Sequence, residues 1–173
     1  LANGQAFYDS VRAMGSLAIS LFNAGYGIDL NRPYAEIQAE IAAVLGDPAS
    51  SAIIPNLQKI IDLIGAITAK PVLERQFFQT AFGTGDITSV TTQAQYNALI
   101  AVVTQGGEFP YPGAAASAAI LTANYSLYQA VKAAGEPAIT NFNSIYGVNV
   151  DLPITLSGYT ALSGIPQTPR YNE

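Results

Sequence analysis

The chain of 173 residues contains no cysteine and no histidine. Their absence excludes thiolate nucleophiles, disulfide bonds, imidazole acid–base chemistry and the usual zinc and haem ligands. Charge is also scarce, because only 11% of the residues are charged, whereas soluble domains carry about 25%. Half of the residues are apolar, yet no uninterrupted apolar run reaches the roughly 18 residues that a membrane-spanning helix needs. We therefore expect no cofactor, no metal site and no membrane span.

The charges that are present do not favour an anionic partner. Seven basic residues are scattered along the chain and are outnumbered by twelve acidic ones, which gives a net charge of −5. No basic stripe is available to follow a phosphate backbone or to hold anionic lipid, so we expect no nucleic-acid partner. The sequence starts at Leu1 rather than at methionine. A removed secretory leader explains this start and predicts an extracellular or cell-surface location, although an artificial boundary explains it too.

One stretch of the sequence occurs twice. Residues 7–33 and 127–153 are identical at 11 of 27 positions, whereas composition alone would match roughly two. We interpret the stretch as a duplicated unit, made either of two short helices or of one helix kinked at its glycine. The identical positions are Tyr8/Tyr128, Val11/Val131, Ala13/Ala133, Gly15/Gly135, Ala18/Ala138, Ile19/Ile139, Phe22/Phe142, Asn23/Asn143, Tyr26/Tyr146, Gly27/Gly147 and Pro33/Pro153.

Apolar residues spaced three and four apart predict further helices between and around the two copies. Thr92 and Gln95 have the spacing of a capping box, which would start one of these helices. Glycine or proline follows most of the predicted helices and would end them. The predicted helices cover residues 33–45, 55–69, 71–82, 92–105 and 114–134.

These patterns predict an all-α fold. We expect a single helical domain of six to eight helices, spanning residues 1–153 and containing the internal duplication. The two units would pack about an approximate two-fold, with the helices 55–69 and 71–82 between them. The last residues, 154–173, show no helical period and are predicted to form an irregular C-terminal arm. Such an arm would lie along its own body or reach a neighbouring molecule.

No catalytic constellation is recognisable among the remaining side chains. Glu36 and Glu40 share one helical face, which we interpret as a solvated surface rather than as an acid–base pair. Asp29 and Asn149 follow the Tyr-Gly pairs and offer oxygen ligands, but a calcium loop normally gathers several acids within a dozen residues. We expect a non-enzyme, and a carboxylate-based hydrolase is the remaining catalytic alternative.

Aromatic pairs in the two copies are the candidate site residues. Phe22 and Tyr26, like Phe142 and Tyr146, are four residues apart and would stack on one helical face. One interpretation makes them two corresponding pieces of core. The other makes them equivalent surfaces for a second subunit or for a flat apolar ligand.

The leading functional hypothesis is a non-catalytic structural subunit, secreted or surface-exposed, that self-associates into a filament, sheath, shell or capsid. Low charge, surplus apolar residues and the expected arm support it. The alternative is a helical carrier that binds a lipid, a pigment or another apolar small molecule between its two repeat units. Alanine-rich duplicated helical units are similar to those of peridinin–chlorophyll proteins, although this chain lacks the histidines of that family and matches no motif of it.

Overall fold

A computed structural model describes residues 2–104 and 111–166, and all regular structure in this part of the chain is helical. The all-α fold class predicted from the sequence is confirmed. Nine α-helices and one short 3-10 helix are present in the described ranges, one α-helix more than the upper end of the expected count. They are α1 (Ala2–Ala13), α2 (Ser16–Tyr26), α3 (Tyr34–Leu45), η1 (Pro48–Ala52), α4 (Ile53–Thr68), α5 (Val72–Phe82), α6 (Gln93–Thr104), α7 (Ala114–Ala134), α8 (Ala138–Tyr146) and α9 (Leu156–Ser163).

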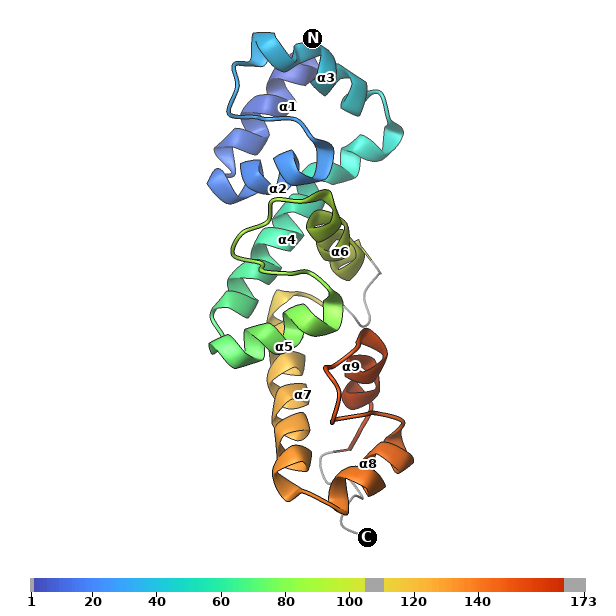
Figure 1. The fold of residues 1–173 in the computed structure, drawn as a ribbon. Helices are drawn as coiled ribbons and strands as arrows, with labels where there is room; N and C mark the ends of the chain where they lie inside the picture. Colours follow the sequence, from blue (N-terminus) through green and yellow to red (C-terminus); the bar gives the residue numbers. More distant parts are fainter. Residues whose placement is uncertain (1, 105–110, 167–173) are drawn as a thin grey trace.

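The helices form three consecutive units, α1–α3, α4–α6 and α7–α9, which are stacked along one axis, with the first and the third unit at opposite ends of the stack (Figure 1). Within each unit the third helix packs against the first, as α3 on α1, α6 on α4 and α9 on α7. Between units the second helix contacts the first and third helices of the next unit, as α2 does with α4 and α6 and α5 does with α7 and α9. Successive units share this contact, and the second joint adds an extensive contact between α4 and α7.

The two copies of the repeated stretch lie in the first and the third unit, at opposite ends of the stack (Figure 1). The predicted helices 55–69 and 71–82 correspond to α4 and α5 and do lie between them. The expected two-fold packing is wrong, because the middle unit separates the copies and each unit follows the previous one in series. Each copy spans the end of one helix and the whole of the next, α1 and α2 in the first copy and the 21-residue α7 and α8 in the second, with breaks at Gly15 and at Gly135 to Pro137. A common origin of the two copies stays a prediction.

The C-terminal arm requires a correction. Part of the segment predicted to be irregular, 154–173, forms α9, and its Tyr159 is only 1% exposed. The Thr155 hydroxyl caps this helix by accepting a hydrogen bond from the N–H of Gly158 at 3.1 Å. Asn124 of α7 holds it by donating hydrogen bonds to the Tyr159 carbonyl and the Ser163 hydroxyl. The described part of the arm therefore packs on its own chain, and residues 167–173 lie outside the described residues.

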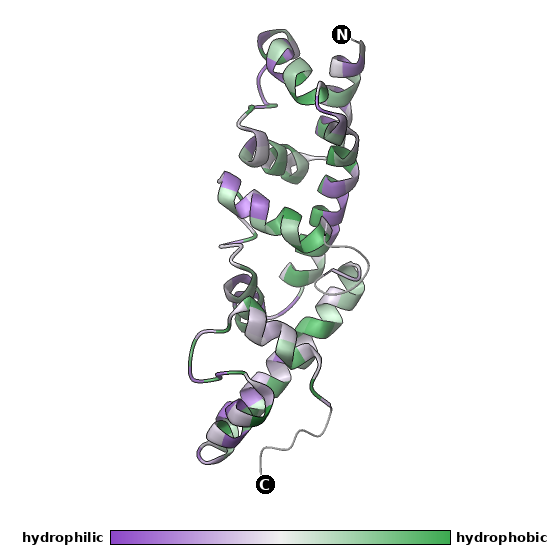
Figure 2. Cartoon of the chain, turned by 90° about the vertical axis from the view of Figure 1, so that its right-hand side faces the viewer, coloured by the Kyte–Doolittle hydropathy of each residue, from purple (hydrophilic) through white to green (hydrophobic). Residues whose placement is uncertain are grey.

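A single hydrophobic core runs through all three units, from Phe7 to Leu162. Hydrophobic segments are accordingly spread along the whole stack rather than gathered at one level (Figure 2). Each unit contributes a phenylalanine from its second helix, and Phe22, Phe78 and Phe142 are at most 2% exposed. Within the described ranges, no helix combines the length and the apolar character needed to cross a bilayer.

Candidate functional site

The same hydrogen-bonded turn follows the second helix of every unit. A side-chain oxygen on the last turn of the helix accepts a hydrogen bond from a backbone N–H beyond the helix end. A glycine in the left-handed conformation, which glycine adopts without steric cost, reverses the chain between the two groups. The bonds run from Leu30 N–H to Asn23 Oδ1 (2.9 Å), from Ile87 N–H to Gln79 Oε1 (3.1 Å) and from Val150 N–H to Asn143 Oδ1 (3.1 Å), across Gly27, Gly83 and Gly147.

The four predicted site residues lie beside this turn, but the structure separates them by burial. Phe22 and Phe142 are fully buried, so their rings belong to the core and do not form a surface. Tyr26 and Tyr146 are half-buried, and each packs against its phenylalanine, with ring centroids 4.7 and 5.0 Å apart. Only the two tyrosines are therefore placed to reach a ligand or another molecule.

A third aromatic residue completes the joint between the first two units, and sequence reasoning missed its role. Tyr96 of α6 packs edge-to-face on Tyr26, with ring centroids 5.6 Å apart. The next joint repeats this contact, since Tyr159 of α9 packs edge-to-face on Phe82 at 5.1 Å. Gly25 makes the first contact feasible, because a methyl group added there would lie 2.5 Å from the Tyr96 ring. The sequence contained one signal for this role, because α6 and α9, the third helices of the second and third units, each carry a tyrosine.

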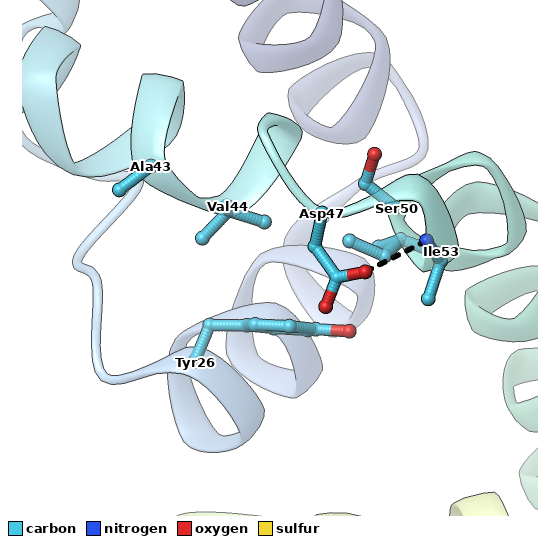
Figure 3. A pocket seen from close by; sticks show the side chains of 7 residues that line it. Tyr26, Ala43, Val44, Asp47, Ser50 and Ile53 are labelled. Carbon is cyan, nitrogen blue, oxygen red and sulfur yellow. Dashed lines mark hydrogen bonds between the residues drawn. The ribbon is translucent and has the colours of Figure 1, made fainter.

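Two hollows flank Tyr26, with volumes of about 350 and 520 Å³. Both fall in the range of about 300–1,000 Å³ that is typical of small-molecule sites. Among the described residues, Asp47 is the one charged residue that lines either of them. The larger hollow is lined by Gly25, Tyr26, Ala49, Ala52, Ile53, Asn56, Gln93, Tyr96, Asn97 and Ile100, and the smaller one by Tyr26, Ala43, Val44, Asp47, Ala49, Ser50 and Ile53 (Figure 3).

The hydroxyl of Tyr96 is buried, and within the described ranges no group meets full hydrogen-bond geometry with it, the nearby Tyr26 included. Burial raises the pKa of Tyr96 far above the usual value for tyrosine, and the neighbouring Tyr26 raises it further. The phenol therefore stays protonated at neutral pH and can act as a hydrogen-bond donor but not as a base. The larger hollow is thus a neutral site in which amides and phenols offer hydrogen bonds beside aromatic rings.

The acidic candidates do not converge on a cleft. Glu36 and Glu40 are exposed on α3, and Glu36 forms an ion pair with Arg32 at 3.4 Å, as expected for a solvated helix face. The carboxylate of Asp29 accepts a hydrogen bond from the N–H of Asn31 and belongs to the repeated turn. No group of three acidic side chains is close enough to hold a metal ion in the part of the chain that the structure describes.

The last unit exposes the position at which the earlier units receive their neighbours. Counted two residues before the turn glycine, this position is Gly25 in the first unit, Ala81 in the second and Ile145 in the third. Gly25 and Ala81 are buried, whereas Ile145 is 49% exposed at the end of the stack. Leu152 and Leu156 are also exposed in the third unit, at positions that correspond, at the shift of 120, to Arg32 and Glu36, which stay exposed in the first unit.

No family model, curated protein or solved structure matches the chain. We therefore infer function from the two features just described, the Tyr26 joint and the exposed end of the third unit.

Proposed function

We propose that the protein is a non-catalytic structural subunit that self-associates into a homopolymeric assembly, outside the cell or on its surface. The observation that carries the proposal is the exposure of Ile145 at a position where both earlier units are covered by the next unit. A further copy of the chain would cover it, because the second helix of each earlier unit already packs against the first and third helices of the next unit. A contact of this kind, repeated from copy to copy, closes into a ring or continues as a filament.

Covering Ile145 would favour association and leave it weak. Full burial of an isoleucine side chain contributes about 1.5–3 kcal/mol. Ile145 is 49% exposed, so covering it contributes roughly 1 kcal/mol. A millimolar dissociation constant corresponds to about 4 kcal/mol. Association should therefore depend on concentration, and the low charge of the chain lowers the repulsion between copies.

Light scattering coupled to size-exclusion chromatography, together with negative-stain microscopy, tests the proposal over a range of protein concentrations. We expect the apparent mass to rise with concentration, and the rise to be lost in the variant Ile145→Ser. The matched control is Val72→Ser, which removes an apolar side chain of similar exposure, 54% against 49%, from the middle unit. A monomer at every concentration, or equal loss in both variants, contradicts self-association through this end. Antibody labelling of intact cells tests the extracellular location.

The alternative, a carrier for an apolar small molecule, needs a different site from the one the sequence suggested. The space between the two repeated units is occupied by α4–α6, whose Leu57, Ile60 and Leu63 are fully buried. The larger hollow beside Tyr26 is the observation that favours a carrier, because aromatic and aliphatic side chains line it. Organic extraction of the purified protein followed by mass spectrometry tests it. A bound apolar molecule that Ile100→Gln removes supports the carrier, and extracts equal to buffer contradict it.

A further inference from the structure

The smaller hollow beside Tyr26 combines an aromatic wall with a carboxylate. It opens between the end of α2, the last turns of α3 and η1, and it measures about 350 Å³. Figure 3 shows the Tyr26 ring edge-on, with Val44 and Asp47 on one side of its plane. The hollow therefore lies against one face of the ring.

The aromatic wall is held in a fixed position. Phe22 is stacked on the Tyr26 ring at 4.7 Å with an interplanar angle of 20°, and it is itself fully buried. Tyr96 fixes the ring from a second direction, with its edge-to-face contact at 5.6 Å. With one face covered by Phe22, the ring presents its other face to the hollow. The face of an aromatic ring carries partial negative charge and attracts cations.

The carboxylate wall is also oriented. Asp47 precedes η1, and its Oδ1 accepts a hydrogen bond from the N–H of Ala49 at 2.9 Å. Figure 3 shows the second carboxylate oxygen pointing toward Tyr26. No ion pair to Asp47 is present in the described ranges, where the one salt bridge joins Arg32 and Glu36. The carboxylate thus brings an uncompensated negative charge to the hollow.

The other walls select the kind of cation. Ala43, Val44 and Ile53 are aliphatic, and they would contact carbon atoms attached to the charged nitrogen. A metal ion would instead need several oxygen ligands, and Asp47 is the one acidic residue that lines the hollow. An anion would meet both a carboxylate and the negative face of a ring.

We propose that this hollow, the Tyr26–Asp47 pocket, binds an alkylated ammonium head group. The aromatic face and the carboxylate share the positive charge, and the aliphatic walls contact the alkyl groups. A quaternary ammonium such as choline and the ammonium end of a lysine side chain present the same chemistry. Binding here is independent of self-association, because the residues exposed at the end of the third unit do not line this pocket.

Calorimetric and NMR titration of the full chain with choline tests the proposal. The probe is compared with 3,3-dimethylbutan-1-ol, which has the same shape without the charge. We expect choline to bind with a dissociation constant in the roughly millimolar range, because exposed charges attract weakly. The uncharged analogue should bind at least tenfold more weakly. Nα-acetyl-lysine amide forms a second arm, and its tighter binding would identify a protein side chain as the source of the ammonium group.

Variants test the contributions of the Asp47 carboxylate and the Tyr26 ring separately. Asp47→Asn retains an oxygen for the Ala49 N–H and should weaken choline binding about tenfold. Tyr26→Leu removes the ring and should weaken binding by roughly 2- to 30-fold, whereas Tyr26→Phe should retain it. Tyr146→Leu is the matched control, because Tyr146 also packs on the phenylalanine four residues before it, with ring centroids 5.0 Å apart, in the third unit.

Three outcomes overturn the proposal. They are equal binding of choline and its uncharged analogue, unchanged binding in Asp47→Asn, and equal loss in Tyr26→Leu and Tyr146→Leu. Circular dichroism reports whether each variant is folded. If Tyr26→Leu does not fold, the comparison of the two probes and the Asp47→Asn variant decide the matter.

Discussion

Replacing the side-chain acceptor of the repeated turn should destabilise the protein by an amount that depends on which unit carries the change. In Asn143→Ala the N–H of Val150 loses its partner, and leaving such a group unsatisfied costs about 1–3 kcal/mol. Asn143→Asp keeps an oxygen in the same place and should retain most of the stability. Asn23→Asp should not, because the amide nitrogen of Asn23 lies 3.3 Å from the carboxylate of Asp29. The third unit has the uncharged Asn149 instead of that acid.

The size of the difference follows from Coulomb's law. Two like charges about 4 Å apart repel by roughly 1 kcal/mol in water and by roughly 4 kcal/mol near a protein surface of lower dielectric constant. Because the contact between Asn23 and Asp29 is exposed, we expect the lower end of this range, about 1 kcal/mol. The Asn23→Asp variant should therefore be less stable than Asn143→Asp by about that amount in dilute buffer, and 1 M salt should remove most of the difference.

Urea unfolding followed by circular dichroism measures these free energies. For a chain of this length, 1 kcal/mol corresponds to a shift of roughly 2–4 °C in the thermal midpoint, which provides a second readout. The reasoning fails if Asn143→Asp is as unstable as Asn143→Ala. It also fails if the two aspartate variants are equally stable at low salt.

Further changes test the joint and the core. Gly25→Ala should destabilise the protein by about 1–3 kcal/mol, because the new methyl group would lie 2.5 Å from the Tyr96 ring. Gly65→Ala, which has open space around it, should stabilise the protein by up to about 1 kcal/mol, and urea titrations measure both changes. Tyr96→Phe removes a buried hydroxyl that no described group meets in full hydrogen-bond geometry, so its thermal midpoint should equal or exceed that of the parent chain. Burial raises the pKa of Tyr96 and of Tyr159, so the unfolded chain releases these protons first and stability should fall as the pH rises above about 10. Urea unfolding between pH 8 and 11 checks this, and a fall in Tyr96→Phe as steep as in the parent chain would contradict it.

Helix positions were predictable because capping residues and glycines close in sequence determine where the helices start and end. Thr92 and Gln95 do form the expected capping box, with the Gln95 N–H donating to the Thr92 hydroxyl and the Thr92 N–H to the Gln95 side chain. Gly27 and Gly147 end their helices in the left-handed conformation that few other residues adopt. Such signals depend on neighbours within one turn, so a single sequence contains them.

The third occurrence of the turn was not predictable from a fixed shift of 120 positions. In the middle unit Gln79 takes the place of asparagine, and one additional residue separates Gly83 from the bonded N–H of Ile87. The longer side chain and the longer loop compensate for each other in space, but both disrupt an alignment. Helix α9 was missed because a helix of only eight residues, one of them glycine, shows little hydrophobic periodicity. Its burial depends on contacts with α5 and α7, which the sequence does not reveal.

The candidate site was predictable only in part. The sequence identified Phe22 and Tyr26 as a pair. The structure adds that Tyr26 also contacts Tyr96, so the pair lies at the contact between the first and the second unit. Tyr96 and Asp47 come from segments 70 and 21 positions away from Tyr26, and no spacing rule connects residues at such distances. Their proximity is a product of how α6 and η1 pack on α2 and α3.

The serial stack also determines how the chain would carry mechanical load. Helices α1 and α8 lie toward opposite ends of the long axis, so tension applied between the first and the third unit would be transmitted from one joint to the next (Figure 1). In each joint the second helix of one unit packs on two helices of the following unit, and α4 also packs on α7. A pulled molecule would therefore extend in successive steps, one unit at a time, as tandem helical repeats with nearest-neighbour contacts do.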